Sequence, residues 1–136
     1  MKVEVYQMIA DPEGKECSFN RIGTVSSKGA GIRPDLVWHL TNHSCWNFTR
    51  GKDDDCVERK TIKADGCKYY PTVWDRGYTN DDICFELDGE WWCAKSIGWE
   101  TLSTKDEAKR YLFEHASWVR LRLSSNVEYS QIKDNF

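Results

Sequence analysis

The sequence lacks a long apolar run, a strong net charge and any internal repeat. No stretch approaches the roughly 18 apolar residues that a membrane-spanning helix needs, and the N-terminal segment has no signal-peptide core. Lys and Arg total 19 against 22 Asp and Glu, a formal net charge of −3, which gives no overall attraction to nucleic-acid phosphates. We therefore expect a cytoplasmic protein with no membrane contact and no sequence-specific nucleic-acid binding.

Familiar catalytic and metal-binding motifs are also missing. The chain has no nucleophile elbow, no dinucleotide fingerprint and no H-E-x-x-H. None of its six cysteines forms a C-x-x-C pair, so we expect no metal and no cofactor. Residue types that bind zinc do occur, although not at the spacing of a zinc site, and they are His39, His43, Cys45, Cys56 and Cys67.

The cysteines leave two interpretations open. In a reducing compartment they are expected as small buried thiols. Two glycosylation sequons, at residues 42–44 and 47–49, instead favour a secreted module held together by disulfides. Mass measurement separates the two, because six oxidised cysteines have lost six hydrogens.

Aromatic residues are abundant. Seven Trp, six Tyr and five Phe occur in 136 residues, and each buried ring removes roughly 150–250 Å² from water. The length suits one domain with one core. Rings therefore supplement a thin supply of aliphatic side chains.

Alternation of apolar and polar residues predicts strands in the first part of the chain. Residues 2–9 alternate well enough for an opening strand. Residues 26–34 are rich in glycine and close with Pro34, which predicts a loop. Residues 35–41 alternate again, with Leu36 and Trp38 on one face, so we expect a further strand there.

Two Asp-Gly pairs, at residues 65–66 and 88–89, predict β-hairpins. Asp-Gly suits a type I′ turn, whose two central residues both need positive φ. In the second hairpin Cys84 is predicted to lie opposite Cys93, as two thiols. Trp91 shares their face, which we expect to be the outer one.

A helix follows the second hairpin. Thr104 and Glu107 form a capping box, and Ala108, Leu112 and Ala116 then repeat at helical spacing on one face. We expect this to be the helix on which the sheet packs.

The remaining residues predict a strand and a polar tail. Residues 118–123 alternate, which puts Val119, Leu121 and Leu123 inward and points Trp118, Arg120 and Arg122 outward. Residues 124–136 are mostly polar. The expected fold is therefore α+β: a single domain over residues 1–123, mostly an antiparallel sheet of hairpins packed on one C-terminal helix.

Two histidine motifs offer a candidate active site. His39 and His115 each have a hydroxyl residue two positions later, Thr41 and Ser117, and Arg120 follows the second motif. This pattern resembles the two-histidine phosphoesterase superfamily. The resemblance implies that both histidines are catalytic, that the hydroxyls and Arg120 hold phosphate, and that the substrates are cyclic nucleotides or cyclic phosphates. The alternative places His39 on a sheet face and His115 as a cation at a helix C-terminus.

A second candidate is a ligand-binding face formed by Trp91, Trp118, Arg120 and Arg122. Arg donates in a planar, bidentate manner to phosphate or carboxylate, and Trp provides a plate for stacking. In the alternative, the helix or tail covers the tryptophan and the arginines pair with Asp and Glu.

The hypothesis we favour is a non-catalytic binding protein, because Trp and Arg concentrate binding energy at interfaces. Its style is that of a phage-type inhibitor of a host defence system, which captures a host protein or a small anionic, nucleotide-like ligand. The oligomeric state is open, and a two-histidine phosphoesterase is the alternative.

Overall fold

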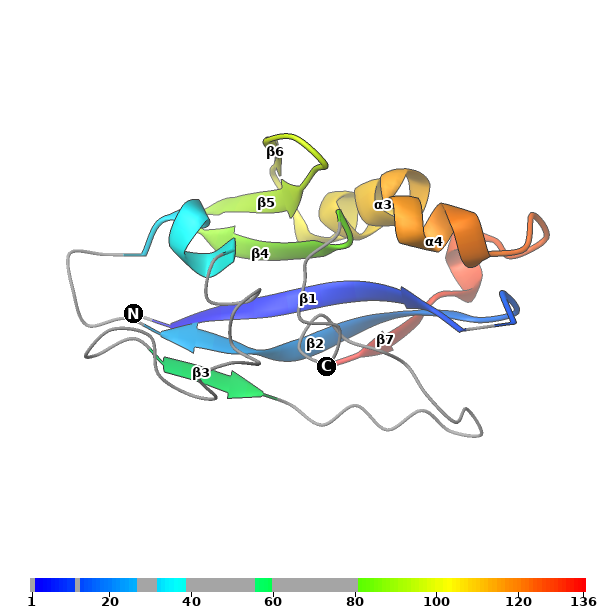
Figure 1. Ribbon diagram of the computed structural model, residues 1–136, viewed down its shortest axis with the longest axis horizontal. Helices are drawn as coiled ribbons and strands as arrows, with labels where there is room; N and C mark the ends of the chain where they lie inside the picture. The colour runs from blue at the N-terminus through cyan, green and yellow to red at the C-terminus, as the bar shows by residue number, and fades with distance from the viewer. Residues whose placement is uncertain (1, 12, 27–31, 39–55, 60–80) are drawn as a thin grey trace.

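The fold is a twisted, mostly antiparallel sheet with two consecutive helices along one face and a short helical segment against the other (Figure 1). The computed structural model describes residues 2–11, 13–26, 32–38, 56–59 and 81–136. The strands and helices follow one another as β1 (Lys2–Ala10), β2 (Cys17–Ser26), β3 (Cys56–Arg59), β4 (Ile83–Leu87), β5 (Glu90–Ala94), β6 (Trp99–Leu102), α3 (Lys105–His115), α4 (Ser117–Arg122), the 3-10 turn η1 (Tyr129–Gln131) and β7 (Lys133–Asn135). The order in the sheet is β3-β2-β1-β4-β5-β6, and β7 pairs with β2. This architecture confirms the predicted α+β class.

Alternate side chains of the strands point to opposite sides of the sheet. Both sides carry buried apolar residues, and each side is covered by another segment of the chain. One face packs against Ile32 and Val37, which belong to the segment 32–38. The other face packs against α3 and α4 through Ala108, Leu112 and Val119. The sheet is therefore the middle layer of the described molecule, a point that decides which tryptophans reach the surface.

The long β1–β2 hairpin forms the centre of the sheet. The strand predicted over residues 2–9 is confirmed by β1, which runs antiparallel to β2 with a bulge between Val5 and Tyr6. Strand β2 was not predicted from the sequence. Its turn is held by Asp11, whose Oδ1 accepts from the backbone N–H of Lys15 at 2.7 Å.

The second predicted hairpin is confirmed in detail. Asp88 and Gly89 have φ of +53° and +81°, the conformations that a type I′ turn requires. Phe85 lies opposite Trp92, and Cys84 lies opposite Cys93. The described cysteines Cys17, Cys84 and Cys93 are free and buried. The first predicted hairpin, around residues 65–66, lies outside the described residues.

Two predicted strands are helical instead. Residues 34–38 form a short helix where a strand over 35–41 was expected. Pro34 occupies the first helical position, where its fixed φ and missing N–H fit, and the N–H of Val37 donates to the Arg33 carbonyl at 3.2 Å. The strand predicted over 118–123 is wrong in the same way, because α4 occupies those residues. Short apolar stretches satisfy both periodicities, and packing decides between them.

The helix predicted after the second hairpin is confirmed as α3. The N–H of Glu107 donates to Thr104 Oγ1 at 3.1 Å, which caps the first turn. Ala108 and Leu112 are its buried residues, and Ala116 follows as the C-cap. Among the described residues no helix is both long and apolar enough to cross a membrane.

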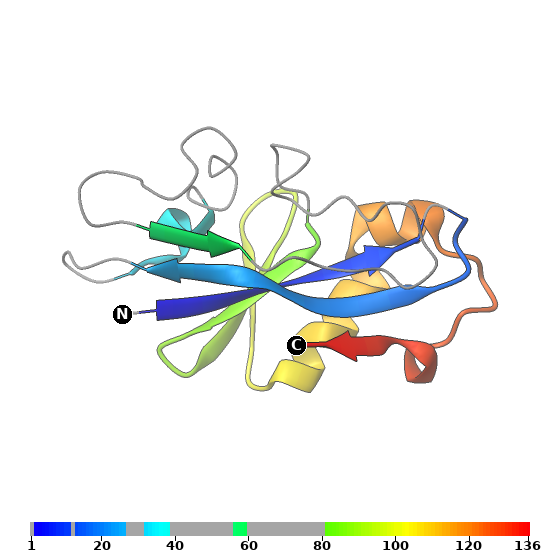
Figure 2. The same ribbon diagram turned by 90° about the horizontal axis from the view of Figure 1, so that it is seen from below.

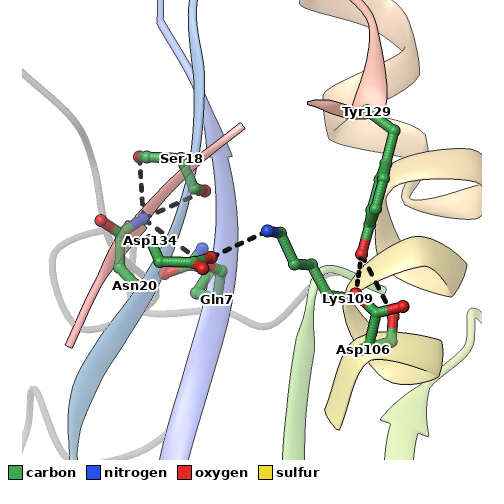
Figure 3. Close-up of polar contacts among 7 residues, drawn as sticks. All are labelled: Gln7, Ser18, Asn20, Asp106, Lys109, Tyr129 and Asp134. Carbon is green, nitrogen blue, oxygen red and sulfur yellow. Dashed lines mark hydrogen bonds and ion pairs between the residues drawn. The ribbon is translucent and has the colours of Figure 1, made fainter. Parts of the chain in front are cut away.

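The polar C-terminal segment 124–136 adds structure to the sheet. Ile132 is buried, and β7 runs parallel to β2 with Ser18 opposite Lys133. Lys109 of α3 reaches across to β7, where its Nζ lies 2.9 Å from Asp134 Oδ1 (Figure 3). Both β7 and β3 pair with β2, and Figure 2 shows them near its opposite ends.

Candidate binding surface on helix α4

Helix α4 begins directly after α3, with a change of direction at Ala116. The backbone of Ala116 is extended, and both the N–H and the Oγ–H of Ser117 donate to the Asp81 carboxylate, at 2.9 and 2.7 Å. The negative charge of the Asp81 carboxylate also interacts favourably with the positive end of the helix dipole. Val119 anchors α4 because it is the buried residue that joins the core.

Trp118 and Arg122 form a stacked pair one helical turn apart. The Arg122 guanidinium carbon lies 4.6 Å from the centre of the Trp118 ring, within the range of a cation–π contact. Both side chains are half-buried. Together with Gln7 and Asp82 they line a cavity of about 10 Å³, which has room for one water molecule.

Arg120 stacks in the same manner on the other flank of α4. Its guanidinium carbon lies 4.5 Å from the centre of the Phe113 ring of α3. Arg120 is exposed, whereas Phe113 is half-buried. Within the described part of the chain, neither Arg120 nor Arg122 has a carboxylate in ion-pair range. The expected pairing of these arginines with Asp or Glu is therefore not seen there.

Leu121 projects between the two arginines. Its exposed fraction is 77%, and residues of a helix advance by roughly 100° each. Leu121 therefore lies nearly opposite the buried Val119, with one stacked arginine on each side. We call Trp118, Arg120, Leu121 and Arg122 the α4 surface.

The helical conformation changes the membership of the predicted binding face. Trp118 and Arg122 lie together on one flank of α4, whereas Arg120 lies on the other flank, and Leu121, predicted to point inward, is exposed between them. Trp91 does not belong to this face, because its exposed fraction is 7% and it packs under α3. The prediction of an outward Trp91 is wrong, since the helices cover that side of the sheet.

The second histidine motif does not have the strand geometry that the phosphoesterase resemblance implies. His115 ends α3 and Ser117 begins α4. The exposed His115 ring lies 4.6 Å from the Tyr111 ring, centre to centre, and its Nε2 lies 3.9 Å from Glu114 Oε2. Ser117 is bound to the Asp81 carboxylate, whose charge would repel a phosphate. His39 and Thr41 lie outside the described residues.

Two titratable groups near the α4 surface, Cys17 and Tyr111, have raised pKa values. Burial raises the pKa of the Cys17 thiol to about 12, and the nearby positive charge of Arg120 opposes only part of that rise. Burial also raises the pKa of Tyr111. In the described ranges no group of three or more His, Cys, Asp or Glu could hold a metal ion.

The α4 surface combines polar donors with an apolar side chain. Two guanidinium groups keep their N–H edges available while their faces rest on aromatic rings, and an apolar side chain stands between them. Comparison with known proteins adds no relative to this picture: no protein family model, no curated protein and no solved structure matches the chain.

Proposed function

We propose that this protein is a non-catalytic binding protein whose α4 surface docks onto an acidic segment of a partner protein. The observation that carries the proposal is the 77% exposed Leu121 between two ring-stacked arginines. Arginine is enriched at protein interfaces and among the residues that contribute most to binding energy, and the exposed Leu121 adds an apolar contact between the two arginines.

Stacking prepares the arginines for binding. A guanidinium lying on a ring has lost part of its rotamer freedom before a partner arrives, so less conformational entropy is lost on association. Its N–H edge still donates two parallel hydrogen bonds to a carboxylate. The matching partner presents an apolar side chain for Leu121, with Asp or Glu on either side for Arg120 and Arg122.

The shape of the surface favours a protein over a small anionic ligand. Pockets for small molecules usually enclose about 300–1,000 Å³, whereas the cavity beside Trp118 and Arg122 holds about 10 Å³. A nucleotide would also leave the exposed Leu121 without a contact. The nucleotide-like ligand of the sequence analysis is therefore an outcome to test at this surface.

We further propose that the protein works in a reducing compartment such as the cytoplasm. Cys84 and Cys93 face each other across a strand pair as free thiols, and Cys17 is a third buried thiol. Burial is the environment in which a cysteine acts as a small apolar side chain. An intact mass without the loss of hydrogens would support this proposal.

The binding proposal is tested with defined acidic peptides. A display library with one apolar residue flanked by Asp and Glu is selected against the wild-type protein, beside a library with Lys and Arg in the flanks. We expect enrichment from the acidic library alone. The Kd of a selected peptide, measured by fluorescence polarisation, should rise with salt because the Debye length falls from about 10 Å at 0.1 M to about 3 Å at 1 M.

Variants locate the contact. We expect the Kd of the selected peptide to rise by about tenfold or more in each of three variants, Arg120→Ala, Arg122→Ala and Leu121→Asp. Arg110→Ala is the matched control, because Arg110 also stacks on a ring, that of Tyr129, but is paired with Glu114. Equal weakening by the control, or no acidic peptide in the selection, would contradict the proposal.

The enzymatic alternative has its own assay. The protein is incubated with cyclic dinucleotides and 2′,3′-cyclic nucleotides, and products are separated by chromatography. Turnover that His39→Ala and His115→Ala both abolish would overturn the binding proposal. A rise in melting temperature without turnover would indicate a nucleotide-sequestering protein instead.

A further inference from the structure

A larger pocket lies away from the α4 surface, between the short helix at residues 34–38 and the turn that joins β5 to β6. Its volume is about 440 Å³, within the range of small-molecule sites. The lining side chains that can bind a ligand are Asp35, Trp38, Lys95, Ser96 and Trp99. Neither the predicted binding face nor the histidine motifs include any of them.

Two tryptophans give the pocket its apolar walls. The Trp99 ring is fixed by edge contacts to Phe85 and Trp92, with ring centres 5.5 and 6.1 Å away. Trp38 has an exposed fraction of 41%, which is large for a tryptophan beside a pocket. Exposed indole faces gain free energy when a flat ring covers them.

The pocket also carries one charge of each sign. The Asp35 carboxylate makes no ion pair or hydrogen bond with the residues that the structure describes. Lys95 Nζ lies 3.8 Å from Glu100 Oε2, and these side chains are 43% and 42% exposed. Such a solvated pair contributes little, so Lys95 can turn to a ligand at small cost.

We infer that this pocket binds a small zwitterion with an aromatic ring, the class of the free aromatic amino acids. The ligand ammonium faces Asp35, the carboxylate faces Lys95, and the ring lies against the indoles of Trp38 and Trp99. The site is independent of the α4 surface, because it shares no residue with it.

The balance of charge separates this class from a nucleotide. A nucleoside monophosphate carries about two negative charges at neutral pH. Against these the described lining offers the single ammonium of Lys95, while Asp35 and the neighbouring Glu100 repel. A zwitterion gives Asp35 and Lys95 one opposite charge each, and Glu100, which Lys95 would leave, is 42% exposed and remains solvated. A simple organic cation would leave Lys95 unfavourably close.

The test uses L-phenylalanine and three analogues, titrated into the full chain and followed by isothermal calorimetry and saturation-transfer NMR. Phenethylamine lacks the carboxylate, 3-phenylpropionate lacks the ammonium, and adenosine monophosphate represents nucleotides. We expect L-phenylalanine to bind, and each of the three comparators to bind at least about fivefold more weakly.

Substitutions assign the contacts. Asp35→Asn keeps the shape of the side chain and Lys95→Met keeps most of its length, so each removes mainly a charge and should weaken the binding of L-phenylalanine by about fivefold. Trp38→Ala should lower the affinity for L-phenylalanine by about tenfold. Glu13→Gln is the control, because Glu13 is exposed in the β1–β2 turn. Circular dichroism confirms that each variant is folded.

The outcomes divide cleanly. No binding of L-phenylalanine, equal binding of phenethylamine or 3-phenylpropionate, or tighter binding of adenosine monophosphate would each overturn the assignment. So would an affinity that the Trp38 and Lys95 substitutions leave unchanged in folded variants. The α4 proposal is unaffected by any of these results, since its peptides are tested at other residues.

Discussion

At the scale of single residues, the buried thiols determine how the protein responds to pH and to alkylating agents. Burial raises the pKa of Cys84 well above its ordinary value, and a hydrogen bond with Cys93 adds to the rise. Cys93 also donates to the Ala108 carbonyl oxygen at 3.9 Å. Thiols are unreactive because the nucleophile is the thiolate, so these cysteines resist alkylation while the protein is folded.

Stability is predicted to fall at alkaline pH. An unfolded cysteine titrates near pH 8.5, whereas Cys17 in the folded protein has a pKa of about 12. Between about pH 8.5 and pH 12 the unfolded chain loses a proton that the folded protein keeps, so the free energy of unfolding decreases as the pH rises. Tyr6 acts in the same direction, because burial and the hydrogen bond to Glu4 raise its pKa to about 12.

Urea unfolding at about pH 7 and about pH 10 measures this effect. The urea midpoint of the wild-type protein should decrease at the higher pH. The midpoint of Cys17→Ala should decrease by less, because the variant lacks the thiol whose pKa is raised on folding. An equal decrease in both proteins would contradict the assignment to Cys17.

At the scale of elements, the β1–β2 turn is joined to the end of α4. The N–H of Ser124 donates to the Gly14 carbonyl oxygen at 2.9 Å. Gly14 has a φ of +72°, and a Cβ there would collide with the Arg122 carbonyl oxygen. The close approach of these two backbones needs glycine for both its φ and its lack of a side chain.

Gly14→Ala is therefore expected to destabilise the protein more than Gly89→Ala. Both residues have positive φ, which costs about 1 kcal/mol or more for alanine, but a Cβ at Gly89 meets open space. The difference in urea midpoint between the two variants measures the collision. Equal destabilisation would show that the α4 end moves away freely.

The attachment of β7 depends on Lys109 of α3. Its side chain is 14% exposed and lies 2.9 Å from Asp134, and its Nζ lies 5.2 Å from the centre of the Tyr129 ring. Tyr129 in turn donates to Asp106 Oδ1 at 2.7 Å (Figure 3). These contacts tie η1 and β7 to the helix layer.

Lys109→Met should loosen β7 while the rest of the sheet keeps its structure. Loss of a hydrogen-bonded ion pair worth about 1.5–3 kcal/mol predicts that the β7 amides exchange hydrogen roughly tenfold faster or more. Lys133→Met is the control, because Lys133 is well exposed and lies 3.8 Å from Glu16. Unchanged exchange in Lys109→Met would show that main-chain pairing alone holds β7.

At the scale of the whole molecule, local signals identified the elements whose ends are fixed by short-range chemistry. The Asp88-Gly89 turn set the register of β4 and β5, and the Thr104 cap set the start of α3. Both depend on residues close in sequence. No comparable local signal marks β2. Its apolar alternation is interrupted by polar residues such as Asn20, which is nevertheless buried in the folded protein.

The arrangement of the candidate site residues depends on the element that carries them. Strand alternation would put Trp118, Arg120 and Arg122 on one face, whereas α4 places Arg120 on the flank opposite the stacked Trp118 and Arg122, with the exposed Leu121 between them. Trp91 was assigned to the surface because alternation distinguishes the two faces of a strand but not which of them is covered. That choice depends on where α3 packs, which is a long-range contact.

The long edge of β2 is divided between two segments from distant parts of the chain. β3 runs antiparallel along Gly23–Ser26, and β7 runs parallel along Ser18–Asn20. An unprotected strand of this length would invite pairing with neighbouring molecules. Because each segment seals its own half of the edge, losing one would uncover only a short stretch, too small for another chain to extend into an ordered fibre.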